Sequence, residues 1–139
     1  MSAIIRQATC VAIGGRALLI EGEPGSGKSS LALALIDRGA VLVGDDAVTL
    51  ELRGDRVHAS PPPNIAGRLE IRNVGLVTLP VTEALVALLV TLDEAAPRQP
   101  DPAASTDLLG CKVPHLALYP GAAALTLRAE YALRERGIA

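Results

Sequence analysis

Residues 22–29, Gly22-Glu23-Pro24-Gly25-Ser26-Gly27-Lys28-Ser29, are the stretch of this sequence that decides the fold. They match the pattern G-x-x-x-x-G-K-[ST] at every fixed position. In this pattern a glycine-rich loop turns successive backbone N–H groups inward around an anion. An apolar run, Ala17 to Glu21, precedes the loop, and a run rich in helix-forming residues, Ser30 to Arg38, follows it. A strand before the loop and a helix after it form the context in which this pattern binds phosphate.

Each part of the loop has an expected role in binding ATP and Mg²⁺. Lys28 is expected to reach the β- and γ-phosphates, and the Ser29 hydroxyl to bind Mg²⁺. The helix that begins near Lys28 points the positive end of its dipole at the same place. A glycine-rich surface turn without a ligand is the alternative interpretation. The predicted nucleotide-binding residues are Gly22, Glu23, Pro24, Gly25, Ser26, Gly27, Lys28, Ser29 and Ser30.

The segments on both sides of the loop predict an α/β fold in which a P-loop, a mixed sheet and flanking helices form one domain. Apolar runs around Gly14-Gly15 predict a β-hairpin that leads into the loop. Gly39 is a natural end for the helix that follows. The predicted strands are 11–13, 17–21, 40–44, 47–52, 56–59, 69–73, 76–79, 86–92 and 116–118, and the predicted helices are 30–38 and 122–136.

Residues 95–107 contain three prolines and few large apolar side chains, which predicts a flexible loop within a single domain spanning residues 1–139. A chain of 139 residues is typical of about one domain and buries roughly two thirds of its unfolded surface. Because there is no Phe or Trp, the core must consist of Leu, Val, Ile and Ala.

Composition excludes several classes of function. There are 13 basic and 15 acidic residues, for a formal charge of −2, whereas nucleic-acid binders usually carry an excess of Lys and Arg. The lack of aromatic residues also argues against stacking on single-stranded nucleic acid. The longest apolar run, Ala84 to Leu92, is far shorter than the roughly 18 residues of a membrane-spanning helix. Since the first residues do not resemble a signal peptide, a cytoplasmic location is expected.

The cysteines and histidines carry no recognisable motif. Cys10 and Cys111 have neither metal-binding spacing nor the pattern of a disulfide framework, and they are expected to be buried free thiols in a reducing compartment. His58 and His115 match no catalytic pattern and are expected at the surface.

Two pairs of carboxylates are candidates for catalysis and metal binding. Asp45 and Asp46 directly follow a predicted buried strand, where an unpaired carboxylate costs desolvation energy. In a parallel sheet the end of that strand lies on the same edge as the loop. Asp93 and Glu94 follow another apolar strand and look more like a generic magnesium-binding sequence, but they precede the proline-rich loop. We expect Asp45 and Asp46 to be the functional pair, and Asp93 and Glu94 to be solvated strand-end charges.

A third feature is Leu69-Glu70-Ile71-Arg72, in which alternation along a strand would place Glu70 and Arg72 on one face. The two charges either form a simple surface pair or supply a Mg²⁺ ligand beside a phosphate-binding arginine.

Together, these motifs resemble the catalytic domain of HPr kinase/phosphorylase, in particular its short alphaproteobacterial form. The likeness extends over residues 7–120 and rests on four segments in order: Gly22 to Lys28-Ser29, Leu35-Ile36-Asp37-Arg38-Gly39, Leu42-Val43-Gly44-Asp45-Asp46, and Leu69-Glu70-Ile71-Arg72 with Gly75. The resemblance implies a fold akin to phosphoenolpyruvate carboxykinase and a hexamer. It also implies transfer of the ATP γ-phosphoryl group to a serine of the phosphocarrier protein HPr, with reverse phosphorolysis in many members.

The resemblance further implies a role for each matching residue. Asp45 corresponds to the general base on the acceptor serine, and Asp46 to the aspartate near Mg²⁺. Glu70 and Arg72 correspond to residues at the metal and at the transferred phosphate. The predicted catalytic residues are therefore Asp45, Lys28 and Arg72, and the predicted metal ligands are Ser29, Asp46 and Glu70.

The sequence departs from the family pattern at three positions near the loop. Gln7 stands where the family has a His, Ser30 stands where it has an acidic residue, and Asn73 replaces the glycine after the signature arginine. Glutamine forms hydrogen bonds but carries no proton at neutral pH. These departures favour an alternative function, a nucleotide-binding regulator with weak or no transfer that signals through a partner such as a sensor kinase. A small-molecule kinase or NTPase is a third interpretation.

Overall fold

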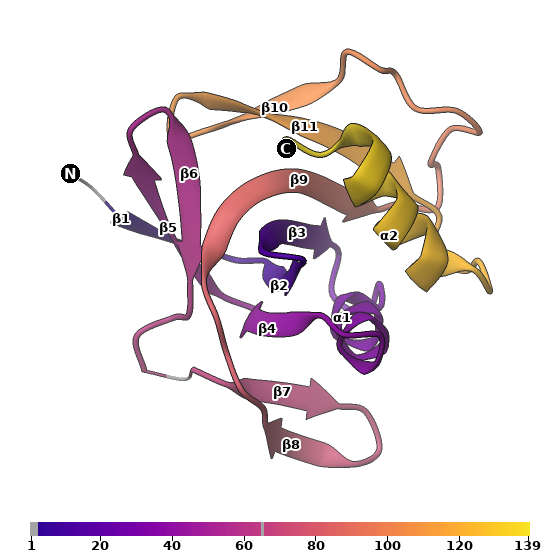
Figure 1. Cartoon of the computed structure of the whole chain (residues 1–139). Coiled ribbons are helices and arrows are strands. Elements are labelled where there is room, and N and C mark those ends of the chain that lie inside the picture. The colour runs from indigo at the N-terminus through magenta and orange to yellow at the C-terminus, as the bar shows by residue number, and fades with distance from the viewer. Residues whose placement is uncertain (1–2, 65) are drawn as a thin grey trace.

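The structure is a computed structural model that describes residues 3–64 and 66–139. A curled sheet forms its centre, and both helices lie on one side of that sheet (Figure 1). The elements along the chain are β1 (Ala3–Arg6), β2 (Thr9–Ile13), β3 (Arg16–Gly22), α1 (Lys28–Asp37), β4 (Val41–Gly44), β5 (Val48–Arg53), β6 (Arg56–Ser60), β7 (Arg68–Ile71), β8 (Gly75–Thr78), β9 (Ala84–Leu92), β10 (Ser105–Leu108), β11 (Cys111–Leu118) and α2 (Leu125–Arg136).

The main sheet is mixed, with strand order β1-β5-β6-β9-β3-β2-β4. β9 pairs with β3 in parallel along most of its length, while its other edge pairs with β6 at the start and with β11 at the end. β10 extends the sheet by pairing with β11, and β7 and β8 form a separate two-stranded sheet below it (Figure 1). This arrangement confirms the predicted α/β class with a mixed sheet.

The antiparallel strand β2 lies between β3 and β4 and pairs with both of them. Because the chain direction reverses twice, β3 and β4 run the same way and end at the same edge of the sheet. The loop after β3 and the carboxylates after β4 therefore meet at one edge, as expected. They do so in a mixed sheet, not in the parallel arrangement on which that expectation rested.

Alternation along β3 divides the core between the two faces of the sheet. Leu18 and Ile20 pack toward α1 and α2, whereas Ala17 and Leu19 pack on the opposite face. Each large aliphatic side chain that is fully buried contributes about 1.5–3 kcal/mol. The largest side chains in the core are aliphatic, as the composition predicts: Leu18, Leu19, Ile20, Leu35, Leu42, Leu50, Leu69, Leu88, Leu89, Leu108, Leu133 and Val11.

Two strands were not predicted from the sequence, and both depend on pairing with distant residues. β1 pairs with β5. β10 begins at Ser105, inside the segment 95–107 predicted to be a flexible loop, because it pairs with β11 through the turn at Leu109-Gly110. The loop prediction is therefore wrong for its last three residues. Helix α1 begins at Lys28, where the helix after the loop was expected to begin, and α2 begins three residues later than predicted, at Leu125.

Both histidines and one cysteine differ in burial from the expectation, since His115 is half-buried, with Nε2 2.8 Å from the Thr91 hydroxyl oxygen. His58 is buried, with Nε2 3.1 Å from Glu83 Oε1, because β6 lies between β5 and β9. Cys10 is buried as expected, and burial raises the pKa of its thiol. Cys111 is only half-buried.

Among the residues that the structure describes, neither helix has the length and apolar character needed to cross a lipid bilayer.

Candidate functional site

The glycine loop connects the end of β3 to the first turn of α1, as its sequence predicts. Gly25 and Gly27 have positive φ angles of 81° and 104°, a conformation that glycine adopts without a steric penalty. Within this described segment, α1 has neither a side-chain cap nor an acidic residue in its first turn. The N–H groups at the start of the helix are therefore available to an anion.

Gly22 is required by close packing inside the loop. A Cβ at this position would lie 2.6 Å from Ser26 Oγ and 3.2 Å from the Leu92 carbonyl oxygen. The Ser26 hydroxyl oxygen is buried and has no hydrogen-bond partner among the described residues. The first glycine of the motif thus allows the loop to fold back against the end of β9.

Lys28 lies folded into the loop, where its ammonium group donates hydrogen bonds to two loop carbonyls. The Nζ atom is 2.9 Å from the Gly22 oxygen and 3.1 Å from the Glu23 oxygen. A lysine ammonium group has three donors, so one remains for a ligand. The positive charge is thereby fixed at the centre of the loop.

Asp45 is the most connected polar residue of the site. Its buried carboxylate accepts hydrogen bonds from the Ser29 hydroxyl at 2.7 Å, the Thr9 hydroxyl at 3.1 Å and the Glu70 backbone N–H at 3.3 Å. These donors belong to α1, β2 and β7. One carboxylate therefore links the loop helix, the main sheet and the separate hairpin.

Thr9 was not predicted as a site residue. Its side chain is fully buried within an apolar strand, yet it hydrogen-bonds to Asp45. A single polar residue in an apolar run, a few positions from Gln7, was the available signal. The partner of such a residue belongs to another part of the chain, so only the structure reveals it.

A cavity of about 650 Å³ brings most of the predicted site residues together. One wall is the loop and the start of α1, and the opposite wall is the turn between β7 and β8. Asp46 lies beside them, so two cations and two carboxylates share the space. The predicted residues that line this cavity are Pro24, Gly25, Gly27, Lys28, Ser29, Ser30, Asp46, Glu70 and Arg72.

Arg72 reaches this cavity by a different route from the one expected. β7 ends at Ile71, and Arg72 begins the turn that contains Asn73 with φ at 72°. The prediction that Glu70 and Arg72 share the face of one strand is therefore wrong. Both residues line the cavity because the chain turns there, and Gly75, predicted as the bend, is the first residue of β8.

Asp46 has an unusual backbone and a shifted acidity. Its φ angle is 63°, in the left-handed region that few non-glycine residues adopt, which turns the side chain out of the buried end of β4. Partial burial raises the pKa of the Asp46 carboxyl, and the charge of Asp45 raises it further. Lys28 opposes this shift, while Glu70 adds to it.

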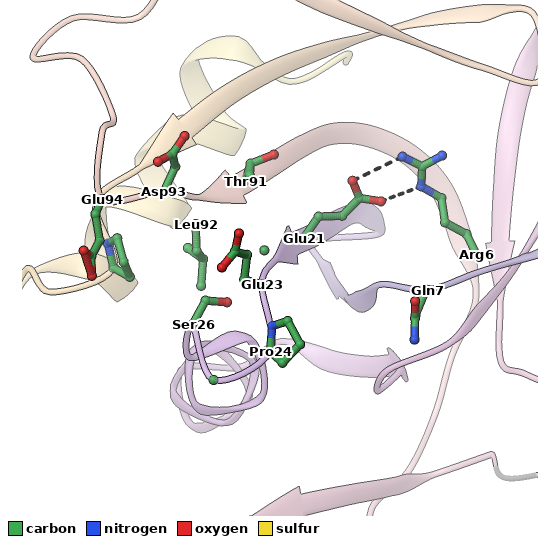
Figure 2. A pocket seen from close by; sticks show the side chains of 13 residues that line it. Arg6, Gln7, Glu21, Glu23, Pro24, Ser26, Thr91, Leu92, Asp93 and Glu94 are labelled. Carbon is green, nitrogen blue, oxygen red and sulfur yellow. Dashed lines mark hydrogen bonds and ion pairs between the residues drawn. The ribbon is translucent and has the colours of Figure 1, made fainter.

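A larger cavity of about 890 Å³ (Figure 2) also borders the loop, and Pro24 and Gly25 line both cavities. Arg6 and Glu21 form an ion pair at its edge, with Arg6 Nη2 3.2 Å from Glu21 Oε1. Gln7 lies next to this pair, and Glu23 and Ser26 project from the loop (Figure 2). Among the predicted loop residues, Gly22, Glu23 and Ser26 line this cavity and not the smaller one.

Asp93 and Glu94 also line the larger cavity, away from Lys28, Asp46 and Glu70. Both side chains are exposed, and Asp93 Oδ1 accepts a hydrogen bond from the Ala95 N–H at 2.9 Å. This position agrees with the interpretation of solvated charges at the end of a strand.

The residues of the smaller cavity fit a magnesium ion that is held partly by a nucleotide. Ser29, Asp46 and Glu70 offer the hard oxygen ligands that Mg²⁺ prefers. Within the described residues, no group of three His, Cys, Asp or Glu side chains forms a metal-binding cluster. Magnesium usually takes only one or two carboxylates, together with water and phosphate oxygens, so such a cluster is not needed.

Comparison with known proteins gives one consistent family. The family model described as HPr Serine kinase C-terminal domain matches residues 2–84. The HPr kinase/phosphorylase of Clostridium tetani is 41% identical over 75 residues, which are 54% of this chain and 25% of the relative. That of Mycoplasmopsis pulmonis is 35% identical over 81 residues, 58% of this chain and 26% of the relative. The matched region thus spans about a quarter of these curated relatives.

The solved structure of the HPr(Ser) kinase/phosphatase from Coxiella burnetii resembles the whole fold. It superposes with a TM-score of 0.82 and 31% sequence identity, covering 94% of each chain. The likeness therefore includes the C-terminal elements that the family model does not match. From the sequence match, the structural match and the fold together, we conclude that this chain belongs to the HPr serine kinase C-terminal domain family.

Proposed function

We propose that this protein transfers the γ-phosphoryl group of ATP to a serine of the phosphocarrier protein HPr, with phosphorolysis as the possible reverse reaction. The observation that carries the proposal is the single cavity in which Lys28, Ser29, Asp46, Glu70 and Arg72 meet. The relatives named HPr kinase/phosphorylase support the choice of HPr as the acceptor. On this proposal, residues 1–139 act as one catalytic domain in the cytoplasm and assemble as a hexamer.

ATP would bind with its phosphates on the loop from Gly22 to Ser30. The backbone N–H groups of the loop and of the first turn of α1 form the anion site, and Lys28 and Arg72 supply positive charge. Ser29, Asp46 and Glu70 would hold Mg²⁺, which neutralises charge on the phosphates when it is bound. Since the chain has few aromatic residues to stack on a base, affinity should come mainly from the phosphates.

The acceptor serine would need a proton acceptor next to the γ-phosphate, and we propose Asp45 for this role. A carboxylate has about four acceptor positions, and Thr9, Ser29 and Glu70 occupy three of those on Asp45. One acceptor position remains for the serine hydroxyl, although Asp45 is buried and does not itself line the cavity of Lys28 and Asp46. The hydroxyl oxygen would form the new bond to phosphorus, the bond between phosphorus and the β,γ-bridging oxygen would break, and ADP would leave. The hydroxyl proton would pass to Asp45.

The direct test is to incubate the protein with Mg-ATP and HPr and to measure the intact mass of HPr. We expect a mass gain of one phosphoryl group on HPr and none on an HPr variant whose acceptor serine is alanine. Lys28→Ala should reduce the gain, because it removes the positive charge from the loop. No gain with the native protein, while calorimetry still shows bound Mg-ATP, would contradict the kinase proposal.

One observation supports the second candidate function, that of a nucleotide-binding regulator. Gln7, which cannot carry a proton at neutral pH, lines the larger cavity, whereas Asp46 lines the smaller one. On this alternative the protein binds Mg-ATP and signals to a partner such as a sensor kinase without efficient transfer. Asp45→Asn separates the two functions, because it should abolish transfer by a kinase and leave the output of a pure binding protein in place.

A further inference from the structure

A third cavity, which includes no residue of the glycine loop, lies between α2, the end of β11 and the proline-rich segment 96–100. Its volume is about 700 Å³, within the range of about 300–1,000 Å³ typical of small-molecule sites. Its floor is apolar and contains Leu116 and Leu118 of β11. It shares no lining residue with the cavity of Lys28 and Asp46.

Both tyrosines of the chain line this cavity, although the protein has no other aromatic residue apart from its histidines. Tyr119 is 46% exposed and Tyr131 is 56% exposed, so neither contributes its ring to the core. A core built from aliphatic residues has no need of these rings. Their shared position at one surface cavity points instead to contact with a ligand, since tyrosine is enriched at binding sites.

Each ring has a contact with a neighbouring residue of the chain. The guanidinium carbon of Arg134 lies 4.2 Å from the centre of the Tyr131 ring, in a cation–π contact. Tyr119 lies against the backbone of Gly121, where an added Cβ would be 2.9 Å from the ring. Such contacts restrict the rotamers of the two side chains, which lowers the entropy lost on binding.

Three arginines at the cavity form no ion pair with a carboxylate among the described residues. Arg98, Arg128 and Arg136 all line it and are exposed, and one acidic residue, Glu135, accompanies them. The arginine–carboxylate pairs among the described residues use Arg6, Arg38, Arg53 and Arg134 instead. A guanidinium group pairs well with a carboxylate or phosphate through two parallel hydrogen bonds. The cavity therefore combines net positive charge with flat apolar surfaces.

We propose that this cavity binds a small organic anion that carries a flat ring, either an aromatic carboxylate or an aromatic phosphate ester. The ring would lie against Tyr119, Tyr131 and the apolar floor. The anionic group would pair with Arg128, or with Arg98 or Arg136, which line the same cavity. The site is independent of the proposed kinase function, because its residues do not include the loop.

The composition of the chain makes this proposal easy to test by NMR. With no Phe or Trp, the aromatic side-chain signals of ¹³C-labelled protein come only from two tyrosines and two histidines. We would titrate the protein with 4-hydroxybenzoate and with phenyl phosphate. We expect at least one of them to shift the Tyr119 and Tyr131 signals in a saturable manner. The probe that saturates at lower concentration identifies the preferred anion.

Variants and simpler probes make the test specific. Arg128→Ala should weaken the apparent affinity by about tenfold or more, because it removes a charge-assisted hydrogen bond. Arg53→Ala, on the distant β5–β6 hairpin, should leave the affinity unchanged. Lys28→Ala should also leave it unchanged, which separates this site from nucleotide binding at the loop. Alanine favours helix, so Arg128→Ala is expected to keep α2 folded.

Several results would overturn the proposal. One is the absence of saturable tyrosine shifts with either aromatic anion. Another is an equal response to phenol or to inorganic phosphate alone, since the site would then not require a ring together with a charge. Unchanged affinity in Arg128→Ala, or lost affinity in Lys28→Ala, would place the ligand elsewhere. Tyrosine shifts that depend on protein concentration, and not on the probe, would show that a second copy of the chain covers the cavity.

Discussion

The Ser29 hydroxyl donates a hydrogen bond of 2.7 Å to the carboxylate of Asp45, and this contact joins the glycine loop to the end of β4. The two residues are neighbours in space because β3 and β4 end at the same edge of the sheet. Asp45 also accepts hydrogen bonds from Thr9 and from the Glu70 N–H. The geometry thus gives this residue a positioning role in addition to the proposed catalytic one.

Asp45→Ala is expected to lower the free energy of unfolding by roughly 1–3 kcal/mol, because the buried Thr9 hydroxyl and the partly buried Glu70 N–H lose their acceptor. Urea unfolding monitored by circular dichroism measures this change. Asp93→Ala, which removes an exposed carboxylate, is the matched control and should change stability by much less. Equal stability of Asp45→Ala and the native protein would show that the hydrogen bonds of Asp45 contribute nothing.

Lys28→Ala is expected to weaken the binding of Mg-ATP by about 10- to 100-fold, the effect of losing a hydrogen bond from a charged donor. Isothermal titration calorimetry measures the dissociation constant. The control is Lys112→Ala, since Lys112 is exposed on β11 and lies outside both cavities at the loop. Nucleotide affinity that survives Lys28→Ala would contradict the assignment of residues 22–29 as the phosphate site.

The raised pKa of Asp46 predicts how stability depends on pH in the absence of metal. Burial, followed by the charge of Asp45, makes the folded protein hold this proton to a higher pH than the unfolded chain does. Ionisation of Asp46 therefore lowers the free energy of unfolding as pH rises through the interval between the ordinary and the raised pKa. Asp46→Asn removes this loss, so the variant should be more stable than the native protein at neutral pH.

The advantage of Asp46→Asn should disappear at a pH below the ordinary range of aspartate, where Asp46 is protonated in both states. Urea unfolding of both proteins at the two pH values, with a metal chelator present, gives the comparison. Asp55→Asn, in an exposed turn, is the control. If Asp46→Asn is instead less stable at neutral pH, the surroundings of Asp46 favour its charged form.

Asp93→Asn tests the competing choice of magnesium-binding residue. Because Asp93 is exposed and lies outside the cavity of Lys28 and Glu70, its neutralisation should leave the affinity for Mg-ATP within about twofold of the native value. Asp46→Asn should weaken Mg-dependent binding in the same assay. A severe loss in Asp93→Asn alone would transfer the metal-binding role to the end of β9.

The local pattern of the sequence was enough to predict the loop and its flanking strand and helix. Gly22, Lys28 and Ser29 occupy fixed positions in a motif whose geometry is set by the backbone. Alternation and turn residues likewise predicted the hairpin of β5 and β6. These features depend on residues that are close together in the sequence, so the sequence pattern alone could predict them.

Contacts between distant residues could not be predicted in the same way. β10 contains little apolar surface, and it forms because β11 offers it a partner. Arg72 reaches the cavity through a turn after β7, although the sequence alternates as if the strand continued. The buried position of His58 depends on β9, which comes much later in the chain. For β10 and His58 the deciding partner lies outside the segment itself.

The β7–β8 hairpin forms a sheet of its own, and this has a consequence for how the cavity behaves over time. A two-stranded sheet is at most marginally stable alone, so this hairpin depends on buried Leu69, on the bond between the Glu70 N–H and Asp45, and on a few backbone bonds at its base. Its amides should exchange with solvent faster than those of β3 and β9, at a lower opening free energy. A ligand that bridges Lys28 and Arg72 would then slow that exchange. Binding at the loop could thus be detected as slower amide exchange in the β7–β8 hairpin, which is far from the loop in sequence.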